Sequence, residues 1–125
     1  MTQRKIGGTD SGQLIGASPY GGPINVYRRI VEGYKVEQTK AMRRGHLLEP
    51  VCRQMYVDET GAELKPSAGV LQSDRYEFMT ASLDDMAVRG GEEIVVEYKS
   101  ANLSTHRQWG EPGTDQVPPH YLAQV

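Results

Sequence analysis

The chain has 125 residues and a mass of 13.9 kDa, which excludes two full domains because a single core usually takes about 100–150 residues. Its 38% hydrophobic and 24% charged residues are typical of a globular chain and exclude a disordered or fibrous one. The net charge of −2, taken whole, argues against a nucleic-acid binder, because such proteins usually carry a basic excess.

Cysteine content and hydropathy limit the cellular compartments in which we expect the protein. The only cysteine, Cys52, excludes an intramolecular disulfide and a cysteine-built zinc or iron–sulfur cage within one chain, and it favours a reducing cytoplasm. The N-terminus has no apolar segment of the kind that signal peptides carry, and no run of about 18 apolar residues occurs anywhere. We therefore expect a protein that is neither exported nor embedded in a membrane.

Two short helices are expected near the N-terminus. Asp10 or Ser11 caps the first, and Pro23 suits the first turn of the second. Apolar residues of the second helix recur at three- and four-residue spacing and predict one buried stripe. These residues are Ile24, Tyr27, Ile30 or Val31, and Tyr34. Arg28 and Arg29 lie beside the stripe, where a solvated face is the simplest interpretation.

The strongest helix signal runs from about Thr39 to Thr60 and ends at Gly61, a residue typical of helix C-termini. Its apolar residues have the spacing of a core-facing stripe. They are Leu48, Val51, Cys52, Met55 and Tyr56. Glu49 lies along the edge of this stripe, where a carboxylate is costly unless it is paired or bound to a metal. Glu49 is therefore a candidate functional residue.

From Ala62 the hydrophobic period changes from 3.6 to 2, which indicates strands. Four are expected, over residues 62–66, 69–73, 78–83 and 93–99. Pro66-Ser67 joins the first two strands, and Gly90-Gly91 is the hairpin turn between the last two. A final helix begins at Pro118-Pro119. The expected order is helices, a meander of strands, then a helix.

Charge is distributed unevenly along the chain. Residues 28–44 hold six basic and two acidic side chains, whereas residues 45–97 hold four basic and eleven acidic ones. This arrangement suits a polyanion lying across the first region and a cation-binding cluster in the second. Two solvated faces of opposite sign explain the charge distribution equally well.

One group of polar residues in the strand region suits a specific chemistry. Glu97 and Lys99 lie two residues apart in the last expected strand and so project from one face. Asp84, followed by Asp85, ends the strand before it, and pairing across the Gly90-Gly91 turn brings that end near Glu97. Carboxylates that hold Mg²⁺ or Mn²⁺, beside a lysine that positions or deprotonates water, suit metal-assisted phosphodiester hydrolysis. Cross-strand salt bridges often produce the same pattern.

Six segments, taken together and in this order, carry a family resemblance: Ile6–Asp10, Ser18–Tyr20, Arg44–Pro50, Met79–Asp85, Val96–Ser100 and Pro119–Val125. They resemble the YqaJ-type viral recombinases, phage-type alkaline exonucleases similar to lambda exonuclease. The resemblance covers nearly the whole chain. It implies a single domain over residues 1–125 with the restriction-endonuclease-like PD-(D/E)xK fold. That fold is α+β with an α/β-type core, in which N-terminal helices precede a mixed sheet and a helix carrying Tyr-x-x-Gln.

The resemblance also implies a role for each matching residue. Asp84 and Glu97 are the expected metal ligands, with the backbone carbonyl of Tyr98 as the third, and Lys99 matches the catalytic lysine. The other matches, expected to bind or orient the metal or to close the site, are Glu49 in the long helix and Tyr121 and Gln124 of the Tyr-x-x-Gln motif.

Two positions depart from the family pattern. Relatives commonly have Asp-Gly where this chain has Asp84-Asp85, so Asp85 is either an extra acidic neighbour or itself the ligand. Relatives bind a terminal 5′-phosphate with an arginine and a hydroxyl residue, for which Arg4 and Thr9 are the nearest matches. Arg28 is the competing candidate, and a surface role for either arginine fits as well.

The function that the resemblance implies is an exonuclease dependent on Mg²⁺ or Mn²⁺. It would degrade one strand of double-stranded DNA ends from 5′ to 3′ and leave a 3′ single strand. The implied partners are DNA ends, a single-strand annealing protein and further copies in a ring, without a membrane, in the cytoplasm of a bacterium that carries a phage or prophage. The family continues beyond the last expected helix, so we expect a C-terminally truncated domain. The alternative is a truncated, non-catalytic DNA-binding remnant of the same fold.

Overall fold

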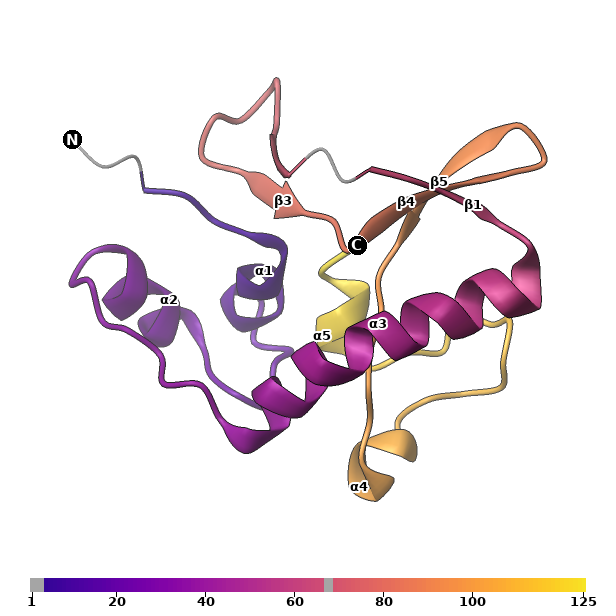
Figure 1. The fold of residues 1–125 in the computed structure, drawn as a ribbon. Helices are drawn as coiled ribbons and strands as arrows, with labels where there is room; N and C mark the ends of the chain where they lie inside the picture. Colours follow the sequence, from indigo (N-terminus) through magenta and orange to yellow (C-terminus); the bar gives the residue numbers. More distant parts are fainter. Residues whose placement is uncertain (1–3, 67–68) are drawn as a thin grey trace. The chain divides into compact units, whose positions relative to one another are not determined.

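The computed structural model describes residues 4–66 and 69–125, and Figure 1 shows the course of the chain. Its elements, in order, are α1 (Gly8–Leu14), α2 (Pro23–Ile30), α3 (Lys40–Thr60), β1 (Glu63–Lys65), β2 (Val70–Gln72), β3 (Thr80–Ser82), β4 (Asp85–Arg89), β5 (Glu92–Val96), α4 (Leu103–His106) and α5 (Pro119–Leu122). The fold is α+β, as predicted. Within the described ranges, no helix combines the length and the apolar character that crossing a bilayer requires.

The chain divides into two compact units that alternate along the sequence. Unit 1 comprises residues 1–36, 71–82 and 101–125, and unit 2 comprises residues 37–70 and 83–100. Unit 1 therefore contains α1, α2, β3, α4 and α5, whereas unit 2 contains α3, β1, β4 and β5.

The ends of α3 lie where the sequence predicts them. Thr39 is the N-cap, and its Oγ1 accepts a hydrogen bond of 3.2 Å from the backbone N–H of Met42. Gly61 ends the helix in the left-handed conformation, with φ at 64°. The helix leads directly into β1, so its C-terminal turn is joined to the sheet of unit 2 (Figure 1).

We expect opposite effects from adding a methyl group at two glycines of this helix. Gly61→Ala should lower the free energy of unfolding by about 1 kcal/mol, because its positive φ strains any residue with a Cβ. Gly45→Ala should raise it by roughly 0.5–1 kcal/mol, because Gly45 is helical and its new Cβ meets only Ser100 Oγ, at 3.7 Å. Urea unfolding of both variants measures the two effects, and a shift of the same sign in both would contradict the account.

The apolar stripe of α3 is buried along one edge only. Tyr56 packs against the core of unit 2 and Cys52 is half-buried, but Leu48, Val51 and Met55 are exposed. The prediction of a core-facing stripe is wrong for these three residues. The reason is the size of the sheet, because its three short strands offer only a small apolar surface to the helix.

The sheet of unit 2 is antiparallel, with strand order β1-β4-β5. Ala87 pairs with Leu64 on one side and with Ile94 on the other. The core consists of buried Ala62, Ala87 and Val96, against which Tyr56, Leu64 and Tyr98 pack. The mixed sheet that we expected is therefore purely antiparallel in this unit.

The hairpin turn at Gly90-Gly91 is present, but it joins β4 to β5. We assigned residues 78–83 to the strand before this turn, and that assignment is wrong because β3, within that range, pairs with β2. The inward positions of β4 are Asp85 and Ala87, so its pattern lacks the large apolar residues that mark a strand. β5 also ends at Val96, before Glu97. The predicted junction at Pro66-Ser67 extends outside the described residues.

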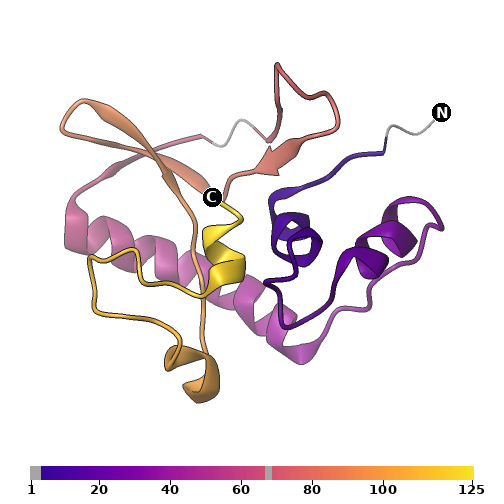
Figure 2. The ribbon, with the colours of Figure 1, turned by 180° about the vertical axis from the view of Figure 1, so that it is seen from behind.

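In unit 1, α1 packs against α2 and α5, and Figure 2 shows α5 beside α1. The approach of α1 to α5 requires glycine at position 12, since a Cβ there would lie 2.9 Å from the Cβ of His120. Gly7, not Asp10 or Ser11, is the N-cap of α1. Asp10, inside the helix, also helps to cap its N-terminus, because its Oδ2 accepts a 2.8 Å hydrogen bond from the Gly7 N–H.

Helix α2 begins at Pro23, as predicted, but it packs through a different face from the one expected. Val26 is buried, while Ile24 and Tyr27 of the predicted stripe are more than half exposed. Arg29 lies one turn after Val26, and its Nη2 is 2.5 Å from Oδ2 of Asp10, a residue only 8% exposed. This ion pair with α1 turns the Val26 face inward and corrects the interpretation of Arg29 as solvated.

Candidate active site

Two acidic residues lie at the open end of the β4–β5 hairpin in unit 2. Asp84 directly precedes β4 and Glu97 directly follows β5. Because Asp85 pairs with Val96 in an antiparallel register, Asp84 and Glu97 are the next cross-strand neighbours. Oδ2 of Asp84 accepts a 2.8 Å hydrogen bond from the backbone N–H of Tyr98, which holds the carboxyl group against the end of β5. We expected Asp84 to end the strand over residues 78–83. In the structure it instead directly precedes β4.

Lys99 lies beside Glu97. Its Nζ donates a 2.9 Å hydrogen bond to Oε1 of Glu97, and the two side chains are only 23% and 20% exposed. A partly buried ammonium next to a carboxylate is held in place more firmly than an exposed pair, because less water competes for either charge. The lysine is therefore fixed within reach of any group that Glu97 helps to bind.

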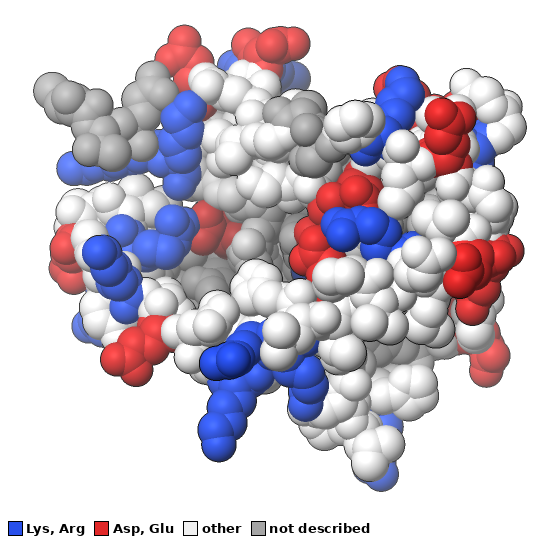
Figure 3. All heavy atoms as spheres, viewed as in Figure 1, with Lys and Arg blue, Asp and Glu red and all other residues white. Residues whose placement is uncertain are grey.

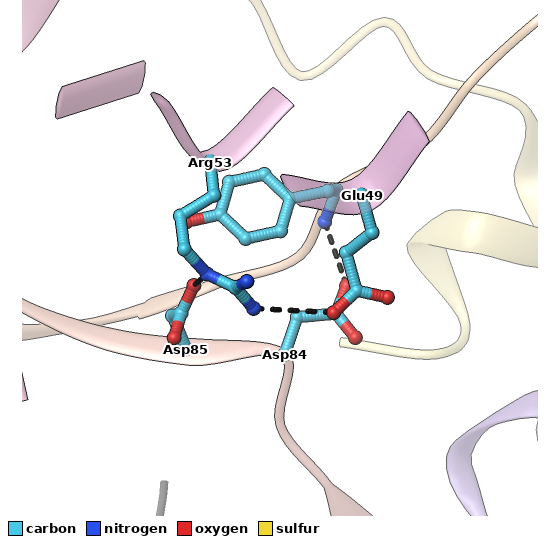
Figure 4. A network of polar contacts seen from close by, with 5 residues as sticks. Glu49, Arg53, Asp84 and Asp85 are labelled. Atoms are coloured by element: carbon cyan, nitrogen blue, oxygen red, sulfur yellow. Dashed lines mark hydrogen bonds and ion pairs between the residues drawn. The ribbon is translucent and has the colours of Figure 1, made fainter. Parts of the chain in front are cut away.

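Glu49 reaches the same end of the hairpin from α3. Its Oε1 accepts a 3.2 Å hydrogen bond from Nη2 of Arg53, one turn later in the helix, and Nε of Arg53 donates a 2.6 Å bond to Oδ2 of Asp85. Figure 4 shows the guanidinium between Asp85 and Glu49, with the carboxyl groups of Glu49 and Asp84 directed toward each other. Two carboxylates in this arrangement repel unless a cation or a proton lies between them.

The aromatic ring of Tyr98 packs against this network of charged side chains. Its ring meets Tyr56 edge to face, with the centroids 6.3 Å apart, and the Arg53 guanidinium lies 5.7 Å from the ring centroid of Tyr98. Burial, followed by the neighbouring Asp85 carboxylate, raises the pKa of the Tyr98 hydroxyl to about 12. The hydroxyl therefore keeps its proton well above neutral pH.

The raised pKa of Tyr98 predicts a loss of stability at alkaline pH. An unfolded tyrosine loses its proton near pH 10, whereas the folded one holds it to about 12. The neutral form thus stabilises the fold fully below pH 10, and this contribution disappears as the pH rises through 12. We expect the free energy of unfolding to fall by about 1–2 kcal/mol over that window. The Tyr98→Phe variant should not show this fall between pH 10 and 12. If both proteins lose stability identically over that range, the Tyr98 hydroxyl is not its cause.

The two units differ less in charge than residues 28–44 and 45–97 do. Unit 1 holds seven basic and six acidic side chains, and unit 2 holds seven and ten. The basic region over residues 28–44 is divided, since its first nine residues belong to unit 1. Asp and Glu atoms are prominent over the β1–β4–β5 side of the face in Figure 3, and some of them border Lys and Arg atoms. Acidic groups of unit 2 therefore lie among compensating cations.

The donor set of this site fits a hard divalent cation. Among residues 4–66 and 69–125, no three His, Cys, Asp or Glu side chains converge closely enough to form a complete metal cage. Asp84 and Glu97 nevertheless supply carboxylate oxygens at neighbouring positions, and both are partly buried. Mg²⁺ is commonly held by one or two carboxylates and completes its shell with water and substrate phosphate. Two carboxylates without a full cage match that preference.

The remaining predicted site residues belong to unit 1. Arg4, Thr9 and Arg28 are exposed, and within the described chain no hydrogen bond or ion pair joins their side chains to one another. Gln124 packs against the start of α1, because a Cβ at Gly8 would lie 3.0 Å from its Cγ. Tyr121, on α5, faces Trp109 with the ring centroids 5.8 Å apart.

Solved structures with a similar fold are known. The fold is similar to that of a solved alkaline exonuclease. It matches an alkaline exonuclease, LHK-Exo from Laribacter hongkongensis, with a TM-score of 0.68 and 24% identity over 98% of this chain and 61% of that one. The complex of LHK-Exo with dAMP matches with a TM-score of 0.71 and 23% identity, over 98% of this chain and 60% of that one.

The family follows from the sequence comparison. The chain belongs to the YqaJ-like viral recombinase domain family, whose model matches residues 1–125. The uncharacterized protein YqaJ of Bacillus subtilis (strain 168) is 24% identical over 125 residues, which cover 98% of this chain and 38% of that protein. The chain thus spans less than two thirds of the length of these relatives.

Sequence reasoning missed Arg53. We counted it only as one of the basic residues, although it is the side chain that joins Glu49 to Asp85. A usable signal was present, because Glu49 and Arg53 are four residues apart on a helix and opposite charges at that spacing face each other. The contact with Asp85 carries no such local signal, since 32 residues separate the two.

Proposed function

We propose that this chain carries the catalytic site of a Mg²⁺- or Mn²⁺-dependent DNA exonuclease of the phage recombination type. The observation that carries the proposal is the Glu97–Lys99 pair next to Asp84 at the end of the β4–β5 hairpin. A carboxylate pair and a lysine with these positions are the groups that phosphodiester hydrolysis requires. Membership of the YqaJ-like family supports the same reaction class.

Asp84 and Glu97 would hold the cation, with the Tyr98 backbone carbonyl as a further ligand and Glu49 binding or orienting it. When bound, such a cation polarises the scissile phosphate and lowers the pKa of water in the site. The 2.8 Å hydrogen bond from the N–H of Tyr98, which holds the Asp84 carboxylate in one orientation, supports this role. Pre-orientation of this kind reduces the entropy that is lost when ligand and substrate bind.

Lys99 would position the attacking water and help to remove its proton. The proposal is supported by the 2.9 Å distance of its Nζ from Oε1 of Glu97, which would bring the two groups to the substrate together. General acid–base assistance by a positioned side chain typically contributes about 10²–10⁴-fold to a rate.

We propose that the two units form one exonuclease domain over residues 1–125. The support is the path of the chain, which passes between the units four times, and the family match over the same residues. In this domain Tyr121 and Gln124 would close the site. Arg4 with Thr9, or Arg28 in their place, would bind the terminal 5′-phosphate.

The substrate would be the end of double-stranded DNA, degraded from 5′ to 3′ to leave a 3′ single strand for an annealing protein. Assembly into a ring and the cytoplasm of a phage- or prophage-carrying bacterium are part of the same proposal. Its support is the family, together with structural relatives that are alkaline exonucleases.

The test compares linear and circular duplex DNA. The protein should release nucleotides from 5′-phosphorylated linear duplex with Mg²⁺, leave closed circular DNA intact and lose activity with EDTA. Cutting of circles would instead indicate an endonuclease. DNA binding without hydrolysis under any divalent cation would indicate the non-catalytic remnant and would sink the exonuclease proposal.

A further inference from the structure

Asp85 occupies a position at which the sequence leaves two roles open, and its contacts decide between them. We infer that Asp85 is not a metal ligand but acts with Arg53 as a positioning pair that fixes the carboxylate of Glu49 at the metal site. This inference rests on the proposed function, and it concerns two residues that the proposed reaction does not use directly.

The carboxylate of Asp85 is committed to the guanidinium. Asp85 is only 7% exposed, and its Oδ2 lies 2.6 Å from Nε of Arg53. A buried carboxylate needs a compensating charge, and the Asp85 hydrogen bond is the foremost cause that raises the pKa of Arg53 above its usual value. The charge of Asp85 is therefore matched by Arg53, whereas Asp84 points toward Glu49 (Figure 4).

Arg53, held by Asp85, in turn holds the carboxylate of Glu49. The guanidinium uses Nε for Asp85 and Nη2 for Glu49, at 2.6 and 3.2 Å, so one rigid plane spans both carboxylates. The ring of Tyr98, 5.7 Å from the guanidinium carbon, supports that plane. Glu49 has a side chain one third exposed on the edge of α3, and without this bond it would sample several rotamers.

The same guanidinium reduces repulsion in the site. The carboxyl groups of Glu49 and Asp84 are directed toward each other (Figure 4), and the positive charge of Arg53 beside Glu49 offsets part of their mutual repulsion. Supporting contacts of this kind typically change metal affinity or activity by about 10–100-fold when they are removed.

The test is Mn²⁺ binding to the full chain, measured by calorimetry and by electron paramagnetic resonance, with no reliance on nuclease activity. Arg53→Lys keeps the charge but loses the planar fork, and Asp85→Asn keeps an acceptor oxygen but loses the charge that anchors Arg53. We expect each to weaken Mn²⁺ binding by roughly 10-fold. Arg89→Lys, at the exposed far end of β4, is the matched control and should bind Mn²⁺ as the wild type does.

The decisive comparison repeats both substitutions in a Glu49→Gln background. If Arg53 and Asp85 act through Glu49, neither should weaken Mn²⁺ binding further there, because the group that they position no longer carries a charge. If Asp85 is itself a ligand, Asp85→Asn should still lower the affinity in that background, and this result would overturn the inference.

Two further outcomes separate this inference from the proposed function. Wild-type affinity in folded Arg53→Lys, verified by circular dichroism, overturns the positioning role and leaves the exonuclease proposal intact. Absence of Mn²⁺ binding in the wild type overturns both. If Arg53→Lys does not fold, Asp85→Asn decides the question alone, since its amide oxygen can still accept the bond from Nε.

Discussion

Lys99→Ala is expected to lower the rate of nucleotide release from linear duplex DNA by about 10²–10⁴-fold at saturating Mg²⁺. The reason is the loss of the ammonium, 2.9 Å from Glu97, that in the proposed mechanism positions the attacking water. The fold should persist, because Lys99 lies beyond the last residue of β5 and is no part of the apolar core. The measurement is single-turnover release of nucleotides from a 5′-labelled linear duplex, compared with the wild type.

Lys65→Ala is the matched control for this prediction. Lys65 lies in the same sheet and forms an ion pair with Glu93, but both side chains are about half exposed. An exposed pair of this kind contributes little to stability and nothing to the site. Equal loss of activity in both lysine variants would show that Lys99 has no specific part in the reaction.

Asp84→Asn is expected to weaken Mn²⁺ binding by roughly 100-fold or more, since changes in supporting residues alone cost 10–100-fold and a ligand should cost at least as much. Activity at low metal concentration should fall in parallel. Asparagine retains a carbonyl oxygen, so the 2.8 Å hydrogen bond from Tyr98 N–H can persist and the hairpin end should keep its shape. Calorimetric titration with Mn²⁺, alongside a thermal melt without metal, separates the loss of the ligand from loss of the fold.

Asp58→Asn is the corresponding control. Asp58 is exposed on α3 and accepts a 2.7 Å hydrogen bond from Gln54, away from the hairpin end. We expect its Mn²⁺ affinity to equal that of the wild type. A loss in Asp58→Asn as large as that in Asp84→Asn would mean that the titration reports general acidic charge and not a defined site.

Local signals in the sequence predicted α1, α2, α3 and α5, but not α4. Thr39 and Gly61 mark the ends of α3 because caps act through adjacent backbone groups, and Pro23 marks the start of α2 for the same reason. The glycine pair predicted the hairpin turn. These features depend on neighbours within a few residues, so periodicity and capping patterns predict them.

Features that depend on tertiary contacts were not predicted. Strand β4 was overlooked because Asp85 occupies an inward position, and its burial is tolerable only with Arg53, 32 residues earlier. Arg29 was assigned to a solvated face because its partner, Asp10, belongs to another helix. Val51 and Met55 have core-like spacing but lie outside the small area that the sheet covers. In each case the deciding contact is distant in sequence.

The central claim is that a divalent cation binds at the end of the β4–β5 hairpin. A crystal grown with Mn²⁺ tests it most directly, through the anomalous scattering of the metal. The account predicts a single strong peak in contact with the carboxylates of Asp84 and Glu97, with Glu49 nearby and Asp85 still bonded to Arg53. A peak that includes Asp85 but not Asp84, or no peak at this end of the hairpin, would contradict it.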